Sequence, residues 1–234
     1  MASSKTFVLV HGAWHGGWGW VRVVDRLRAR GHLVFAPTNT GLGERAHLLT
    51  PQVNASLHIA DIVNLINHED LTDIILVGHS YGGCVISGVI EQVPDKIRAL
   101  VFVDAFIPDN GQSVLDMVQP AVADVIRAAQ TRGETTVPVR DAAAFNVNVK
   151  DRAWVDRLAN PQPIGTMTEK LKLTGARNRV PCIYVRAAGY PNVAFDAALA
   201  RARREGWRTY EVPGGHDIMI NEPERLTEIL LGVT

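Results

Sequence analysis

The stretch Val77-Gly78-His79-Ser80-Tyr81-Gly82-Gly83 decides how the rest of the chain can fold. It follows the apolar run 73–77, which is typical of a buried strand, and precedes residues 84–90, which continue as a helical pattern. In a Gly-x-Ser-x-Gly turn between strand and helix, the serine oxygen stands clear of the sheet and the glycines avoid clashes. We therefore predict that Ser80 is a nucleophile. The alternative is a glycine-rich turn in which this serine is a bystander.

Apolar runs typical of strands alternate with helical patterns on both sides of this turn. The strand-like runs are residues 6–10, 32–37, 73–77, 97–104, 180–185 and 207–212. The helical patterns cover about 20–30, 54–68, 84–90, 192–205 and 223–231. Such alternation with uniformly apolar strands predicts an α/β fold, in which a mostly parallel sheet of about six strands carries helices on both faces.

The alternation stops between Ala105 and about Arg179. Helical patterns there cover 114–130, 154–158 and 167–173, several prolines interrupt them, and no convincing strand is present. No linker-like stretch divides the 234 residues. We therefore predict a single domain, residues 1–234, with a small helical cap inserted at about 107–178.

The charge balance narrows the class of ligand. Lys and Arg number 24 and Asp and Glu number 24, so the chain has no net charge and gives no reason to expect nucleic acid or a membrane as partner. We expect a small, largely neutral ligand. The N-terminal residues show no signal-peptide pattern, so we expect a cytoplasmic protein. The oligomeric state, monomer or homodimer, stays open.

The two cysteines and the histidine pair near the N-terminus argue against a disulfide framework and a metal site. Cys84 and Cys182 both lie in apolar surroundings, so we expect buried thiols. His11 and His15 are four residues apart, but they lie in a glycine-rich loop and not on a helix, so this spacing does not predict a metal site. We expect neither a metal nor another cofactor.

A serine hydroxyl needs a base to take its proton, and eight histidines compete for that role. We predict His216, because it lies in the turn 213–217 after the last strand, where the carboxyl ends of parallel strands open into a ligand crevice. His79 adjoins Ser80, but at an elbow the neighbouring side chain points elsewhere. Three other candidates fit surface or capping positions better: His32, His58 and His68.

Acyl transfer also needs donors for the oxyanion of the tetrahedral intermediate. The N–H of Tyr81, directly after the nucleophile, is one predicted donor. The second should come from the loop after the first strand, where Ala13 offers its N–H.

Three separated motifs carry a resemblance to a known family. Residues 11–18 read His-Gly-Ala-Trp-His-Gly-Gly-Trp, residues 78–83 form the elbow, and residues 214–216 read Gly-Gly-His. Together they resemble the α/β-hydrolase superfamily, and within it the chain is similar to the methylesterase and hydroxynitrile lyase group and to small bacterial esterases acting on carbamate and pyrethroid pesticides. The resemblance implies the α/β-hydrolase fold and a carboxylesterase: a serine hydrolase that cleaves a small hydrophobic or aryl ester, or a carbamate, through an acyl-enzyme.

The carboxylate partner of the base departs from the pattern of these relatives. In the methylesterase group the aspartate follows the strand that corresponds to 182–185, but here the loop 186–192 contains no carboxylate. The preceding strand ends in Asp104, which resembles the place where haloalkane dehalogenases keep their acid. We predict Asp104 as the third member of a catalytic triad, with Asp196 as the second choice and Asp109 as the third.

Two further departures bear on the reaction. Hydroxynitrile lyases of this group have a threonine at the place of Gly12 and a lysine after the catalytic histidine, where this chain has Asp217. Without that cation, cyanohydrin cleavage is disfavoured. A dehalogenase is disfavoured because Ser80 stands at the place of its aspartate nucleophile. A rival from another class is a ligand-binding receptor that keeps a hydrolase fold and has little turnover. Amide hydrolysis and perhydrolysis are not distinguished from ester hydrolysis.

The substrate pocket is expected between the cap and the strand ends, lined by large apolar side chains. The predicted lining residues are Phe106, Met117, Phe145, Trp154 and Met167, with Trp14 at the floor. Their composition favours hydrophobic or aryl esters. The alternative for each of them is a place in the protein core.

Overall fold

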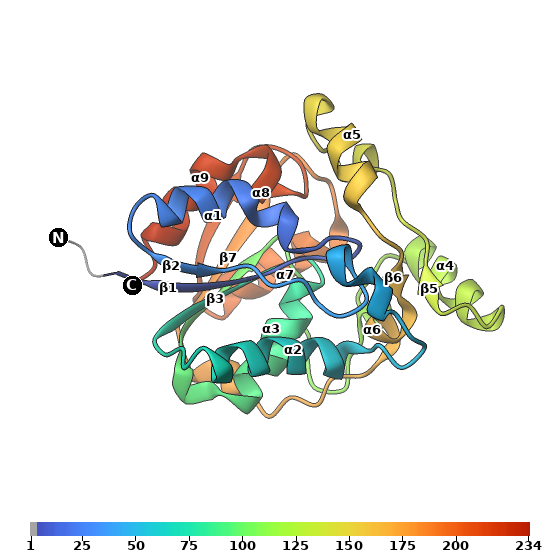
Figure 1. Cartoon of the computed structure of the whole chain (residues 1–234), viewed down its shortest axis with the longest axis horizontal. Coiled ribbons are helices and arrows are strands. Elements are labelled where there is room, and N and C mark those ends of the chain that lie inside the picture. Colours follow the sequence, from blue (N-terminus) through green and yellow to red (C-terminus); the bar gives the residue numbers. More distant parts are fainter. Residues whose placement is uncertain (1–3) are drawn as a thin grey trace.

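The computed structural model describes residues 4–234, so the first three residues of the predicted domain lie outside the described part. Six parallel strands form one sheet in the order β2-β1-β3-β4-β7-β8 (Figure 1). Their bounds are β1 Thr6–Val10, β2 Leu33–Phe35, β3 Ile74–His79, β4 Ile97–Val103, β7 Cys182–Ala187 and β8 Arg208–Val212. The predicted α/β fold with about six parallel strands is confirmed.

Helices cover both faces of this sheet, with α1 and α9 on one face and α2 and α3 on the other (Figure 1). Their bounds are α1 Val21–Arg28, α2 Ala55–His68, α3 Gly82–Gln92, α7 Val193–Arg204, α8 Ile218–Asn221 and α9 Pro223–Leu231. Because both faces are covered, every residue of β3 and β7 is buried, which explains the uniformly apolar strands. Two helices begin at side-chain caps: Asn54 accepts from the N–H of Leu57, and Asn192 from that of Ala194.

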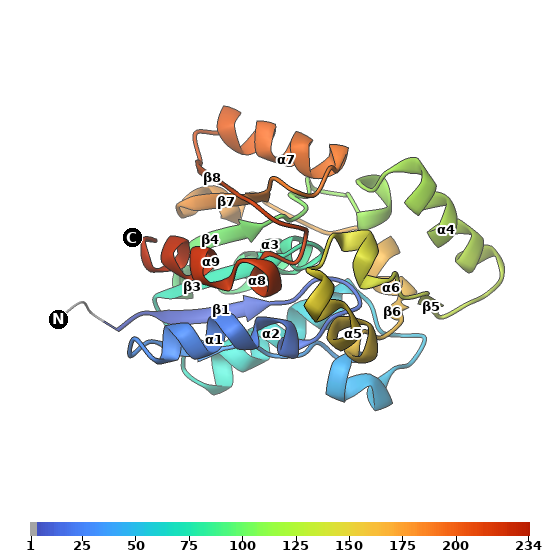
Figure 2. The same ribbon diagram turned by 90° about the horizontal axis from the view of Figure 1, so that it is seen from above.

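The segment between β4 and β7 contributes no strand to the large sheet and lies at the carboxyl ends of its strands (Figure 2). It contains α4 Pro120–Thr131, α5 Val149–Leu158, α6 Ile164–Thr168 and an antiparallel pair of two-residue strands, β5 Thr136–Val137 and β6 Gln162–Pro163. Short 3₁₀ helices occur here and elsewhere, at Gly17–Trp20, Gly43–Leu48, Pro94–Lys96, Val114–Asp116, Ala142–Phe145 and Ala176–Arg179.

All three helices expected in this segment have different bounds. The helix expected at 154–158 begins earlier, at Val149. The pattern 114–130 is divided, because Pro120 lacks an N–H and holds the preceding Gln119 extended (ψ 149°), so a helix can only begin again at the proline. The helix expected at 167–173 ends at Thr168. The chain beyond it pairs with another loop instead, as Leu171 N–H donates to the carbonyl of Gln112.

The order of the strands places a crevice at the ends of β1 and β3. From β1 the chain moves outward to β2 and then returns to the other side of β1 to form β3. In open parallel sheets, ligands bind outside the carboxyl ends of the strands at such a reversal. The loop after β1 and the elbow after β3 therefore face each other across this crevice.

One expectation about the chain can be checked outside the crevice. Cys84 and Cys182 are both buried free thiols, as predicted. Within residues 4–234, the structure contains no helix long and apolar enough to span a membrane.

Candidate active site

Ser80 comes directly after β3, at the start of the sharp turn into α3. Its φ of 53° lies in the left-handed region, which is strained for a residue with a side chain. A Cβ atom on Gly78 would lie 2.5 Å from the carbonyl oxygen of Gly82, and one on Gly82 would lie 2.7 Å from that of Val10. The two glycines of the motif are therefore required by close backbone approach, as the sequence indicated.

The structure brings Ser80, His216 and Asp104 together in one hydrogen-bonded chain. Ser80 Oγ lies 2.9 Å from His216 Nε2, and His216 Nδ1 lies 2.6 Å from Asp104 Oδ2. The backbone of His216 is held by the segment between β4 and β7, because its N–H donates to the carbonyl of Phe145 at 2.9 Å. All three side chains are buried, so the polar atoms of Ser80, His216 and Asp104 are largely removed from water.

Asp104 is fixed by its backbone and by its second carboxylate oxygen. It follows β4 with a φ of 43°, and its N–H donates to the carbonyl of Val185 at 2.6 Å. Oδ1 accepts from Arg186 Nη1 at 2.7 Å and from the N–H of Ala187 at 3.0 Å. These bonds leave Oδ2 directed at His216, so the carboxylate has one orientation in which to hold the imidazole.

The two alternative acids occupy other positions. Asp196 bonds to the Nε and Nη2 atoms of Arg186, at 3.0 and 2.7 Å, and its side chain is 61% exposed. Asp109 pairs with Arg201 at 2.6 Å. Neither has a hydrogen bond to His216, so among the three candidate acids only Asp104 reaches the imidazole in the described structure.

The loop after β1 presents Ala13 close to the elbow. Within residues 4–234, neither its N–H nor that of Tyr81 donates to a protein acceptor. The peptide that carries the Ala13 N–H is held from behind, since Gly12 O lies 2.8 Å from His11 Nδ1. His11 Nε2 accepts from the N–H of Asn39, so the ring is neutral, and burial lowers the pKa of His11 to about 3. Both N–H groups are thus available to a ligand.

A cavity of about 230 Å³ opens at Ser80 and His216. Four of the six residues predicted for the pocket line it: Trp14, Phe106, Phe145 and Met167. Trp154 and Met117 do not, so these two predictions are wrong. The ring of Trp154 packs edge-on against Trp18, at 5.3 Å between centroids, with the guanidinium of Arg22 at 5.3 Å. Met117 lies beyond the turn that carries the true lining residue, Val114.

Sequence reasoning missed several further residues that line this cavity, some between β4 and β7 and others in α7 or just before it. They include Val114, Val118, Val122, Ile126, Arg140, Tyr190, Asn192 and Phe195. The first four recur every fourth residue, a spacing that was available as a signal for one face of a helix. The ring centroids of Tyr190 and Phe195 lie 4.8 and 5.0 Å from that of His216, so these aromatic rings enclose the base.

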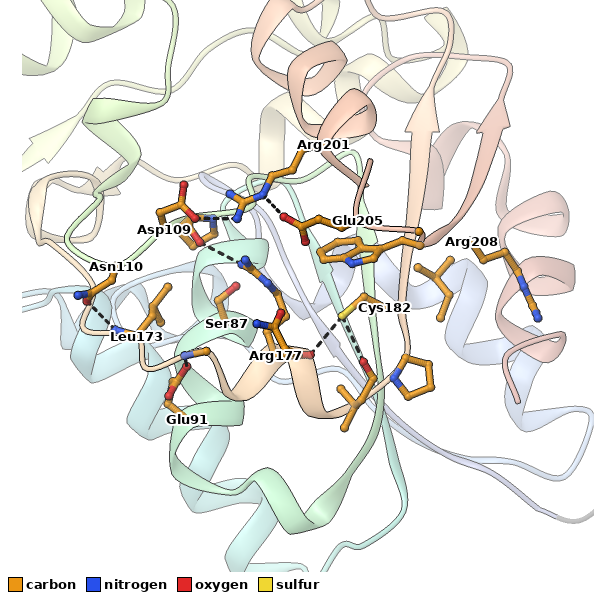
Figure 3. Close-up of a pocket in the computed structure, with 18 of the residues that line it drawn as sticks. Ser87, Glu91, Asp109, Asn110, Leu173, Arg177, Cys182, Arg201, Glu205 and Arg208 are labelled. Carbon is orange, nitrogen blue, oxygen red and sulfur yellow. Dashed lines mark hydrogen bonds and ion pairs between the residues drawn. The ribbon is translucent and has the colours of Figure 1, made fainter. Parts of the chain in front are cut away.

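A larger cavity of about 920 Å³ lies elsewhere, and Figure 3 shows its lining. Ser80, His216 and Asp104 do not line it. Among its charged groups, Arg201 bonds both Asp109 and Glu205. Its one thiol is inert, since burial raises the pKa of Cys182 to about 12. Size alone therefore does not make it the reaction site.

One further histidine lies in a different place from the one expected. His58 is buried, not a surface or capping residue as expected: its Nδ1 accepts from the Tyr81 hydroxyl at 3.1 Å, and its Nε2 lies 2.8 Å from the carbonyl of Thr40. The imidazole of His58 lies on the buried face of α2, where the Tyr81 hydroxyl bonds it. Residues 4–234 contain no group of three His, Cys, Asp or Glu side chains arranged to hold a metal ion.

Comparison with known proteins gives the family. A family model described as the alpha/beta hydrolase family matches residues 7–229. The chain belongs to the alpha/beta hydrolase family. The carbendazim hydrolyzing esterase of Nocardioides sp. (strain SG-4G) is 40% identical over 236 residues, covering 96% of this chain and 97% of that protein. The resemblance drawn from three motifs is thereby confirmed.

Solved structures of other alpha/beta hydrolases share the fold over nearly the whole chain. An extracellular alpha/beta-hydrolase from a Paenibacillus species is 29% identical, with a TM-score of 0.85 over 97% of this chain and 98% of that one. A pyrethroid hydrolase is 21% identical, with a TM-score of 0.72 over 97% of this chain and 96% of that one. The second of these likenesses concerns the fold alone.

Proposed function

We propose that this alpha/beta hydrolase is a carboxylesterase that cleaves small hydrophobic or aryl esters by a serine mechanism. The observation that carries the proposal is the hydrogen-bonded chain from Ser80 Oγ through His216 to Asp104, at 2.9 and 2.6 Å, at the mouth of an apolar cavity. The relative named for carbendazim hydrolysis, at 40% identity, supports hydrolysis as the reaction.

In the first half of the reaction, His216 Nε2 takes the proton of Ser80 as its oxygen attacks the ester carbonyl. The carbonyl π electrons move to oxygen, and the N–H groups of Ala13 and Tyr81 stabilise the resulting oxyanion. Asp104 keeps the second proton of the imidazolium on Nδ1 and stabilises its charge. The carbon–oxygen bond to the leaving alcohol then breaks, and His216 gives that alcohol its proton.

In the second half, water replaces the alcohol. His216 takes one proton from water, the hydroxide oxygen adds to the acyl carbon, and the oxyanion occupies the same two N–H groups. Collapse of this intermediate breaks the bond to Ser80, whose oxygen recovers a proton from His216. An acid is released, and the free enzyme is restored without a cofactor.

The lining of the cavity bears on the substrate. Aromatic and aliphatic side chains make up most of it, and a volume of about 230 Å³ accommodates a small molecule. Hydrophobic and aryl esters fit this surface. The same chemistry extends to an aryl carbamate, whose carbonyl carries an alkoxy or aryloxy leaving group. We further propose that the partner is a small-molecule ester, not nucleic acid or a membrane, and that the enzyme acts in the cytoplasm.

The geometry also weighs against the rival functions. A side chain on Gly12 would place Cβ 2.6 Å from His79 Nδ1, so the threonine of hydroxynitrile lyases does not fit here. Asp217 is fully buried and does not line the cavity, so no charge from this position faces a leaving cyanide. A receptor with little turnover has no need of a carboxylate bonded to His216, yet Asp104 lies 2.6 Å from its Nδ1.

The test is steady-state hydrolysis of 4-nitrophenyl acetate by the wild type and by Ser80→Ala, with an aryl carbamate alongside. We expect the substitution to lower kcat by roughly 10³-fold or more, because the nucleophile is removed while the fold is kept. Equal rates in the two proteins would refute the serine mechanism. Tight binding with a single slow turnover in the wild type would favour the receptor.

A further inference from the structure

Three polar side chains that this mechanism does not use lie together beside the Ser80–His216 pair. His15 follows β1, His79 is the last residue of β3, and Asp217 comes directly after His216. His15 is 2% exposed, His79 is 1% exposed and Asp217 is 0% exposed. Their charges and hydrogen bonds therefore lie in a medium of low dielectric, where the attraction between paired charges is stronger than in water.

His15 bonds through both ring nitrogens. Its Nε2 lies 3.1 Å from Asp217 Oδ2, and its Nδ1 lies 2.8 Å from the carbonyl oxygen of Ala13. A carboxylate and a carbonyl oxygen only accept, so both nitrogens of His15 donate and the ring is positively charged. Burial alone would lower the pKa of His15, but the charge and hydrogen bond of Asp217 raise it overall. The pair is a buried ion pair.

His79 ties the same cluster to the loop of the base. Its Nε2–H donates to the carbonyl of His216 at 3.0 Å, and the same nitrogen lies 3.7 Å from Asp217 Oδ1. Its Nδ1 has no partner among the described residues, so this ring is neutral. The cluster thus holds one backbone carbonyl on each side of the site, that of Ala13 and that of His216.

We propose that Asp217 and His15 are positioning residues for the oxyanion hole. Their ion pair joins the residue after the base to the carbonyl of Ala13, and so it fixes the spacing of the two loops. The other end of the same peptide is also held, because the N–H of Trp14 donates to Gln162 Oε1 at 2.8 Å. The inference rests on the proposed esterase function, which assigns the oxyanion to the Ala13 N–H.

The kinetic consequence is specific. Oxyanion donors act on charge that develops in the transition state, so a displaced Ala13 weakens transition-state binding more than substrate binding. Displacement of a catalytic group by about 1 Å can cost on the order of 10²-fold in rate. Loss of the ion pair should therefore lower kcat and leave KM nearly unchanged.

The experiment compares Asp217→Asn, which keeps the shape of the side chain, and His15→Gln with the wild type on 4-nitrophenyl acetate. Active sites are counted by complete labelling of Ser80 with a fluorophosphonate, so that misfolded molecules do not enter kcat. We expect kcat per labelled site to fall by about tenfold or more with KM within about twofold. The Ki of an aryl trifluoromethyl ketone, which forms an oxyanion on addition of Ser80, should rise by a similar factor.

The matched control is Asp151→Asn, which removes the carboxylate from another ion pair, at 2.6 Å to Arg22; Asp151 lies on α5, outside both loops. It should lower stability and keep kcat per labelled site. Wild-type kcat and Ki in both test variants, with only a lower Tm, would overturn the positioning role. A wild type that neither hydrolyses the ester nor is labelled at Ser80 would instead overturn the proposed function, and this inference with it.

Discussion

Asp104 divides its two carboxylate oxygens between the base and a buried arginine, and this division predicts the effect of replacing it. In Asp104→Asn, the amide oxygen can still accept from Arg186, which leaves the NH₂ group facing His216 Nδ1. Nδ1 must then accept, and the only ring proton moves to Nε2, where it faces Ser80 and cannot serve a base. We expect kcat for 4-nitrophenyl acetate to fall by roughly 10⁴-fold.

Asp196→Asn is the matched comparison, because Asp196 bonds the outer side of the same arginine and does not touch the imidazole. The amide oxygen of the variant can keep a bond to Arg186, so its kcat should stay within about threefold of wild type, as for most exposed substitutions. The opposite ranking of the two variants would assign the acid to Asp196.

The residues of the site differ in how well their roles could be predicted from the sequence. Ser80 and His216 lie in short glycine motifs, whose backbone requirements are local and hence visible in the sequence. Asp104 is a single aspartate at a strand end, and it needed the resemblance as well. The cluster around Asp217 depends on hydrogen bonds between side chains that are far apart in the sequence. His15 and Asp217, for example, are separated by 202 positions, and no local sequence pattern indicates such a pairing.

The turn from β3 into α3 depends on a close approach to the segment that follows β4. The carbonyl of Ser80 accepts from the N–H of Gly83 at 3.1 Å and from that of Phe106 at 3.2 Å. A Cβ atom on Gly83 would clash with the carbonyl oxygen of Phe106, which is backbone and cannot rotate away. The helix and the segment can only pack this closely because residue 83 lacks a side chain.

Gly83→Ala is therefore expected to destabilise the fold by about 1 to 3 kcal/mol, the usual range for overpacking. Urea unfolding at neutral pH measures this loss. Gly232→Ala serves as control, since a Cβ there meets its nearest atom at 3.4 Å and the residue has an ordinary φ of −78°. Equal unfolding free energies for the two variants would show that α3 can shift at no cost.

The cap elements could be predicted only in outline. The spacing of apolar residues indicated their helices but not the bounds of these helices. Helix α4 begins only at Pro120, and the residues after Thr168 form long-range backbone hydrogen bonds in place of helical ones. The strands β5 and β6 are two residues long, too short to show a period of two. Trp154 and Met117 were misplaced because apolar character does not say whether a side chain packs inward or lines a cavity.

Across the whole molecule, the strand order unites parts of the site that the sequence keeps far apart. Loops after β1, β3, β4 and β8 meet at one sheet edge, because all six strands are parallel and end on the same side. Alternation of strands and helices predicted this edge and the residues on it. The same alternation could not predict the buried histidines that hydrogen-bond to the loops, because the burial of a polar ring depends on hydrogen-bond partners from other elements.

Those buried histidines give the fold a dependence on pH. His58 is fully buried, and burial lowers its pKa from 6.5 to about 4, while its two nitrogens already bond Tyr81 and Thr40 in the neutral form. The unfolded chain takes up a proton near pH 6.5 and the folded one does not. Stability from this group is therefore complete above pH 6.5 and is lost as the pH falls toward 4.

For a buried histidine whose pKa is lowered, such as His58, proton linkage lowers the free energy of unfolding by about 1.4 kcal/mol per pH unit as the pH falls through this range. The free energy of unfolding can be measured with urea at about pH 7.5, 6 and 5. We expect its slope against pH to be smaller in His58→Gln than in the wild type, by the equivalent of about one proton. His11, whose pKa burial lowers to about 3, continues to contribute in both proteins. Parallel slopes would mean that His58 takes up its proton without unfolding, with Tyr81 or Thr40 giving up its bond to the ring.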